Sequence, residues 1–222
     1  MIEVKNVSLI LNKYRILDDV SMHAESGEAV GLVGGNGSGK TMLMKCICGF
    51  NTMFTGEILV KEKRIGRDAE FAPDTGFIIE TPGFIPYMTG YENLKMLAGI
   101  NKKPRREEIE KFMELVGLDP GNKKGVKKYS LGMRQRLGLA QALMEDPDIL
   151  ILDEPFNGLD KEMAEKMRRL LAGQKEEGKT ILLASHNEKD IEYICDRTYE
   201  IDAGRMTRHT VKTISPTDTG RM

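Results

Sequence analysis

The glycine-rich segment GGNGSGKT, residues 34–41, constrains this chain more than any other part of it. It fits the pattern GxxxxGK[ST], follows the short apolar run 29–33 and precedes the apolar stretch 42–48. This context predicts a strand, a loop and a helix in that order. Glycines let backbone N–H groups converge on an anion, and the helix start adds its dipole. We therefore interpret the segment as a phosphate-binding loop rather than as an ordinary glycine-rich turn.

The residues of this loop have different expected roles. Lys40 is expected to reach the terminal phosphates, and the hydroxyl of Thr41 is expected to face magnesium. The remaining residues are expected to surround the phosphates with their backbone, and they are Gly34, Gly35, Asn36, Gly37, Ser38 and Gly39.

A second segment, ILILDE at 149–154, ends in two adjacent carboxylates. Its four apolar residues predict a buried parallel strand, so Asp153 should emerge at the carboxyl end of that strand, where ligands bind in open α/β sheets. There it can hold magnesium directly or through water. Glu154 points elsewhere and can orient or deprotonate the water that attacks a γ-phosphate. The alternative is an acidic pair at a turn or helix start.

The segment YSLGMRQR, residues 129–136, lies between these two. Ser130 precedes a stretch with helical apolar spacing that ends before Pro147, which predicts a helix capped by the serine. A capped helix start exposes N–H groups and a hydroxyl, which suits a second phosphate contact. The residues alone favour neither the cap-only interpretation nor the cap-plus-ligand interpretation.

Two further polar residues follow apolar runs. Glu80 follows 76–79 and His186 follows 180–185. Alone, the first is a carboxylate at a strand end, and a single histidine is more often a surface residue than a catalytic one. Together with the glycine loop and the 153–154 pair, however, four separate segments end at the edge of a parallel sheet where ligands bind.

The rest of the chain predicts an α/β fold of a single domain, 1–222. Residues 2–11, 17–24 and 56–60 read as antiparallel strands at the N-terminus, with turns at Asn12 and at Gly27. Region 84–145 reads as a helical insertion. Beyond it, apolar runs and helical stretches alternate, which predicts a parallel core sheet wrapped by helices. The polar tail, 207–222, is expected to be mobile.

Composition excludes several classes of protein. The chain has 222 residues, of which 40% are hydrophobic, and this is enough for one sizeable core. Its formal charge of −1 lacks the basic excess of a nucleic-acid-binding protein, so no nucleic-acid partner is expected. No apolar run is long enough to span a bilayer, and no signal peptide is evident. The cysteines, three in number, suggest a reducing compartment.

Taken together, the motifs resemble those of the ATP-binding cassette (ABC) family, the nucleotide-binding subunits of ABC transporters, over residues 1–206. The resemblance implies a P-loop NTPase of ABC type with a parallel core sheet, an N-terminal antiparallel β subdomain and a helical subdomain. It implies an ATPase that uses ATP and Mg²⁺, with Ser130 and Gly132 contacting the γ-phosphate held by an opposite subunit. His186 resembles the switch histidine of the family, and Asn157–Asp160, NGLD, resembles the loop that communicates between two sites.

The resemblance also implies partners and a location. We expect a homodimer or a paired cassette subunit, and transmembrane permease subunits through which alone the chain contacts the membrane. The chain would then be cytoplasmic and peripheral on the cytoplasmic face. The alternative is a soluble cassette ATPase that acts on ribosomes or DNA; a P-loop kinase or GTPase leaves YSLGMRQR without a role.

Three departures from the family pattern matter. The signature segment has Leu131 and Met133 where glycine and glutamine are common. Glu80 occupies the place of the usual glutamine, which contacts magnesium and senses the membrane partner. With the following TPGFIPYMTGYENL, this glutamate is similar to cassettes that export or detoxify peptide antibiotics such as lantibiotics and bacitracin. The adenine-stacking aromatic is displaced, leaving Tyr14 as the candidate and Leu11 nearest the usual position.

Overall fold

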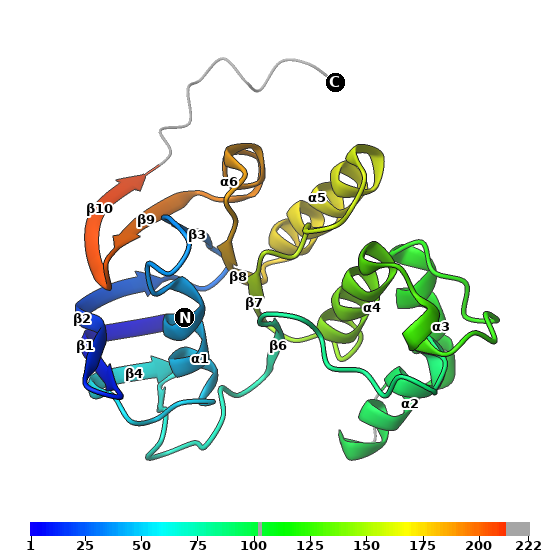
Figure 1. The fold of residues 1–222 in the computed structure, drawn as a ribbon, viewed down its shortest axis with the longest axis horizontal. Coiled ribbons are helices and arrows are strands. Elements are labelled where there is room, and N and C mark those ends of the chain that lie inside the picture. The colour runs from blue at the N-terminus through cyan, green and yellow to red at the C-terminus, as the bar shows by residue number, and fades with distance from the viewer. Residues whose placement is uncertain (102–103, 212–222) are drawn as a thin grey trace.

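The protein folds into two sheets with helices packed between and around them (Figure 1). The computed structural model describes residues 1–101 and 104–211. The antiparallel strands near the N-terminus and the helices α2, α3 and α4 lie at opposite sides of the molecule, with the larger sheet between them (Figure 1). Among the described residues, no helix is long and apolar enough to cross a membrane.

The smaller sheet has the strand order β2-β1-β4-β5 and is antiparallel. Its strands are β1 (Ile2–Leu11), β2 (Tyr14–Ala24), β4 (Thr55–Val60) and β5 (Lys63–Arg64). Asn12 and Lys13 connect β1 to β2 with positive φ at both positions (49° and 70°), which is the geometry of a tight two-residue hairpin. The expected antiparallel region at the N-terminus is confirmed, and it also includes the short strand β5.

The larger sheet has the order β10-β9-β3-β8-β7-β6. The strands are β3 (Ala29–Val33), β6 (Thr75–Ile78), β7 (Ile149–Asp153), β8 (Thr180–Ala184), β9 (Arg197–Asp202) and β10 (Arg205–Val211). The pairs from β6 through β7, β8 and β3 to β9 are parallel, and β10 is antiparallel to β9. The expected parallel core sheet is therefore confirmed.

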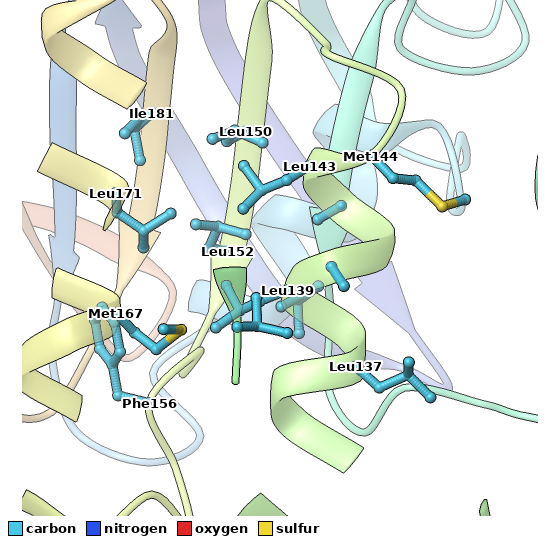
Figure 2. Close-up of a cluster of buried hydrophobic side chains, with 14 of the residues drawn as sticks. Leu137, Leu139, Leu143, Met144, Leu150, Leu152, Phe156, Met167, Leu171 and Ile181 are labelled. Atoms are coloured by element: carbon cyan, nitrogen blue, oxygen red, sulfur yellow. The ribbon is translucent and has the colours of Figure 1, made fainter. Parts of the chain in front are cut away.

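The central strands are mostly apolar because both of their faces are covered. Successive side chains of a strand point to opposite faces. Leu150 and Leu152 of β7 accordingly belong to one apolar cluster, and Ile149 and Ile151 belong to another. Figure 2 shows the first cluster, in which Leu150 and Leu152 lie between side chains of α4 and α5. The second cluster lies between the two sheets.

The helices are α1 (Lys40–Cys48), α2 (Gly90–Asn101), α3 (Arg106–Leu115), α4 (Leu131–Leu143), α5 (Lys161–Glu176), α6 (Glu188–Ile194) and the 3-10 turn η1 (Val126–Lys128). α1 contributes Leu43, Met44 and Ile47 to the cluster between the sheets. α4 packs closely on β6, where a side chain on Gly76 would meet the carbonyl oxygen of Ala142 at 1.9 Å. Of the helical elements, α2, α3, η1 and α4 lie within the region expected to be a helical insertion.

The tail that is predicted to begin at residue 207 starts within a strand of the structure. Residues 205–211 pair with β9 as β10, and the His209 ring stacks on Tyr199 with centroids 4.6 Å apart. Ladder hydrogen bonds and this stacking order a segment whose polar composition does not predict a strand. The remainder of the predicted tail, 212–222, lies outside the described residues.

Candidate functional site

The glycine loop joins β3 to α1 at the carboxyl end of β3, as the sequence predicts. Gly34 has φ 148°, and a Cβ there would come within 2.1 Å of the carbonyl oxygen of Ile201 in β9. Gly39, with φ 114°, precedes the first residue of α1. Both conformations are accessible to glycine and strained for other residues, so the loop depends on glycine at these positions.

The turn between β9 and β10 supports the loop from outside. The backbone N–H of Gly204 donates to the carbonyl oxygen of Ser38 at 2.9 Å, and the Gly204 carbonyl accepts from the N–H of Asp18 at 2.8 Å. Sequence reasoning missed this support. The sequence signal that could have found it is the dipeptide Ala203–Gly204. In the structure these two residues have φ values of 44° and 79° and form a two-residue hairpin turn.

The Lys40 side chain lies inside the loop that it follows. Its ammonium donates to the carbonyl oxygens of Gly34 and Gly35 at 2.7 and 2.8 Å, and the residue is only 7% exposed. A buried ammonium needs such partners because its desolvation is costly. The surrounding polar atoms thus hold a positive charge at the centre of the loop, where it can attract an anion.

Thr41 and Asp153 meet across the edge of the sheet. The Thr41 hydroxyl donates to Oδ2 of Asp153 at 2.6 Å, although the residues are 112 positions apart. A hydroxyl and a carboxylate are the hard oxygen donors that Mg²⁺ prefers, and Mg²⁺ commonly takes one or two protein ligands plus substrate phosphates. The donor set fits this ion.

Glu154 turns away from Asp153 and faces His186. Its φ of 49° is unusual for a residue with a side chain, and its N–H donates to the carbonyl oxygen of Ala184 in β8 at 2.9 Å. Oε2 of Glu154 lies 2.8 Å from Nδ1 of His186. Non-glycine residues with positive φ are sparse and cluster at functional sites. The adjacent carboxylates of Asp153 and Glu154 therefore have different partners, Thr41 and His186 respectively.

Glu80 also has positive φ (58°), and its carboxylate pairs with Lys45 of α1 at 2.7 Å. The sequence interpretation did not include Lys45. The only sequence signal is its position, one helical turn after Thr41, which places both side chains on the same face of α1. Glu80 thus lies at the site together with a compensating positive charge.

These groups line one open cavity of about 540 Å³. The sequence-predicted residues on its wall are Asn36, Gly37, Ser38, Gly39, Lys40, Thr41, Glu80, Asp153 and Glu154. Further lining residues include Ile16 and Lys45, which the sequence did not indicate, and Gln135 and Asn157, which belong to the YSLGMRQR and NGLD segments. Gln135 belongs to the YSLGMRQR segment, and its amide donates to the Glu154 carbonyl oxygen at 3.1 Å.

Ser130 and Gly132 do not line this cavity. The Ser130 hydroxyl accepts a hydrogen bond from the Met133 N–H at 3.1 Å, which confirms the predicted helix cap of α4, and the serine is exposed. Gly132 packs against the 157–160 loop, since a Cβ there would meet the Gly158 carbonyl oxygen at 2.6 Å. Within one chain Ser130 is thus exposed and Gly132 is partly covered by this loop, and contact of either residue with a second subunit stays a prediction.

Tyr14 is also outside the cavity. It follows the β1–β2 turn and is 74% exposed, whereas Ile16 on the same strand lines the cavity. Its role in stacking on adenine stays a prediction. His186, exposed on the far side of Glu154, lines a neighbouring cavity of about 800 Å³ that shares Glu154 and Asn157 with the first.

Comparison with known proteins gives consistent results. The family model described as "ABC transporter" matches residues 17–157. The uncharacterized ABC transporter ATP-binding protein YybJ of Bacillus subtilis (strain 168) is 39% identical over 206 residues, which cover 93% of this chain and 94% of YybJ. The bacitracin transport ATP-binding protein BcrA of Enterococcus faecalis is 38% identical over 199 residues, 88% of this chain and 64% of BcrA.

The fold is shared with solved structures. The ATP-binding cassette MJ0796, in a dimeric post-hydrolysis state bound to ADP and Pi, superposes with a TM-score of 0.84 at 22% identity. The match covers 95% of this chain and 98% of that one. At this identity the likeness shows the fold.

Proposed function

The chain belongs to the ABC transporter family as an ATP-binding subunit, and on this basis we propose that it hydrolyses ATP with Mg²⁺ to drive a separate transmembrane partner. The observation that supports the proposal most is the convergence of Lys40, Thr41, Asp153 and Glu154 on one cavity from separate strand ends. Such convergence at the carboxyl ends of parallel strands is typical of nucleotide sites.

In the proposed site, the backbone N–H groups of residues 34–39 and the dipole of α1 bind the phosphates of ATP. Lys40 exchanges carbonyl partners in the loop for oxygens of the β- and γ-phosphates. Thr41 and Asp153, together with Glu80, would hold Mg²⁺, and the bound ion would neutralise charge that develops on the phosphates. The chain's own contribution is to fix these oxygens in place before the nucleotide arrives.

We propose that Glu154 accepts a proton from the attacking water, while the water oxygen forms a bond to the γ-phosphorus. The bond between that phosphorus and the bridging oxygen breaks, and ADP leaves with the electron pair. His186 is placed by its contact with Glu154 to hydrogen-bond the γ-phosphate and to orient the carboxylate. Glu154 and His186 are thus the proposed catalytic residues.

We further propose that two cassettes close around ATP, either as a homodimer or with a paired subunit. Ser130 and Gly132 of one subunit then contact the γ-phosphate held by the other, which fits the exposure of Ser130 and the position of both residues outside their own cavity. Hydrolysis removes that contact and lets the pair reopen. In this scheme the chain is cytoplasmic and reaches the membrane only through its permease partner.

The cargo proposal rests on relatives and on one residue. BcrA proteins are named for bacitracin transport, and two of them, from Enterococcus faecalis and Bacillus licheniformis, are 38% and 35% identical to this chain. Glu80, in place of the usual glutamine, is the feature of the site by which this chain resembles such cassettes. We propose a peptide antibiotic as cargo, in a system that confers resistance.

The test is phosphate release from MgATP by the purified chain and by Lys40→Met. The variant should lose nearly all activity because the terminal phosphates lose their cation, whereas Lys63→Met, at an exposed lysine of β5, should keep it. Equal activity of wild type and Lys40→Met would contradict the proposed site. Pull-down of the tagged chain with its permease from solubilised membranes tests the partner.

A further inference from the structure

The turn that carries His186 is tied to helix α5 through a buried ion pair. Arg168 of α5 donates through Nε to Oδ1 of Asp190 at 2.6 Å, and the two side chains are 14% and 2% exposed. Oδ2 of Asp190 accepts from the hydroxyl of Ser185 at 2.6 Å. Ser185 is the residue before His186, so the pair acts on the backbone that carries the histidine.

The serine hydroxyl also fixes the other side of that turn. Its oxygen accepts a hydrogen bond from the N–H of Asn187 at 3.1 Å, and the N–H of Asp190 donates to the Asn187 carbonyl oxygen at 3.0 Å. The backbone on both sides of His186 is therefore bonded, directly or through Ser185, to Asp190. The His186 ring itself is exposed, with 66% of its side-chain surface accessible, and packing alone does not place it.

Arg168 connects this turn to the loop that follows Glu154. Its guanidinium lies over the ring of Phe156, with 5.7 Å between the guanidinium carbon and the ring centroid. Phe156 is 8% exposed, and the next residue, Asn157, donates its N–H to the Glu154 carbonyl oxygen at 3.2 Å. One side chain thus contacts both segments that bear the Glu154–His186 contact.

A buried ion pair is weak evidence for stability, because apolar residues of similar volume often stabilise as much. The planar guanidinium of Arg168, by contrast, fixes the direction and the distance of its contacts with the Asp190 carboxylate and the Phe156 ring. We propose that Arg168 and Asp190 are positioning residues that hold the His186 turn and the 154–157 loop at a set separation, so that Nδ1 of His186 stays within hydrogen-bond reach of Glu154. The inference deepens the proposed hydrolytic site and rests on it for its kinetic consequence.

The kinetic test compares Arg168→Met with Arg169→Met. We expect kcat for ATP hydrolysis to fall roughly 10-fold in Arg168→Met, a loss of the size that is common when a residue acts through another group. KM should stay unchanged, because Arg168 does not line the phosphate cavity. Arg169 is the matched control, since it is the next residue of α5, its side chain is 60% exposed, and it pairs with Glu165 across the helix surface. Its variant should match wild type.

A double-mutant cycle with His186→Ala separates positioning from general stability. If Arg168 acts through His186, Arg168→Met should reduce kcat little further in the His186→Ala background. The same roughly 10-fold loss in both backgrounds would overturn the proposal. Should Arg168→Met fail to fold, Ser185→Ala enters the same cycle, since it removes the link to the turn and leaves the ion pair intact.

A nucleotide-free measurement keeps this inference distinct from the proposed function. The chain has three histidines, so ¹⁵N-edited imidazole spectra are simple to assign with His186→Ala. Arg168→Met should shift the His186 resonances and leave those of His23 and His209 in place, and Arg169→Met should shift none. An unmoved His186 resonance would overturn the positioning role, whereas absence of phosphate release from wild type would contradict only the proposed function.

Discussion

Asp153 and Glu154 are neighbours in sequence, yet each carboxylate has a different partner. Asp153 continues β7 and faces Thr41, while the positive φ of Glu154 turns its side chain toward His186. One residue position thus separates the group suited to magnesium from the group suited to water. At the residue scale, the chemistry of the site depends on this local turn, whose strain the N–H contact to Ala184 helps to offset.

The Lys45–Glu80 pair gives a prediction at the same scale. Lys45→Met should weaken binding of a fluorescent ATP analogue about 2- to 5-fold, because Glu80 then lacks its counter-charge beside the phosphates; the effect is small since the Glu80 side chain is 62% exposed. Glu80→Gln added to Lys45→Met should restore binding. Equal losses in the single and double variants would show that Lys45 acts independently of Glu80.

At the scale of the element, α4 combines a structural cap with a predicted ligand role. Ser130→Ala should lower the free energy of unfolding by about 1 kcal/mol, since the Met133 N–H loses its acceptor, whereas Ser130→Asn should retain most of that stability. Chemical denaturation measures this difference. If Ser130 also binds the γ-phosphate across a dimer, both variants should lose ATP-driven dimerisation; recovery of the dimer in Ser130→Asn would leave the serine with the cap role alone.

Helix α1 carries two buried thiols whose burial can be tested chemically. Burial raises the pKa values of Cys46 and Cys48 to about 12, and their side chains are 0% and 2% exposed. At pH 8 both thiols therefore stay protonated, and the thiolate is the reactive form. Iodoacetamide should modify them slowly in the native chain and rapidly in urea, as followed by mass spectrometry. Equal rates in the two states would contradict the burial of α1 between the sheets.

At the scale of the whole molecule, the site lies at the end of the parallel sheet and opens to solvent beside exposed α4 residues. In the proposed function, a second cassette covers this opening when ATP is bound. Glu154→Gln should bind MgATP without hydrolysing it and elute as a dimer in size-exclusion chromatography. ATP at about 100 times its Kd should raise the free energy of unfolding by about 2.7 kcal/mol. The double variant Lys40→Met/Glu154→Gln is the control and should stay monomeric. A monomer for the single variant as well as for the double variant would contradict ATP-driven dimerisation.

The strands and helices nearest the site follow from local patterns in the sequence. Residues 29–33, 149–152 and 181–184 are short runs without polar side chains, and each lies in a central strand because both of its faces are buried. The hairpin of β9 and β10 was missed, because β10 is a polar edge strand whose order depends on pairing with β9 and on the Tyr199 ring. The composition of residues 205–211 does not indicate that they pair with β9.

The sequence by itself determined the phosphate-binding loop, the division of labour expected of Asp153 and Glu154, and the cap at Ser130, because each depends on residues that are close along the chain. Only the tertiary structure decided that Gly204 supports the loop, that Lys45 pairs with Glu80 and that Arg168 contacts both Asp190 and Phe156. Those contacts form between residues far apart in sequence, and their geometry exists only once the sheet and its helices have packed.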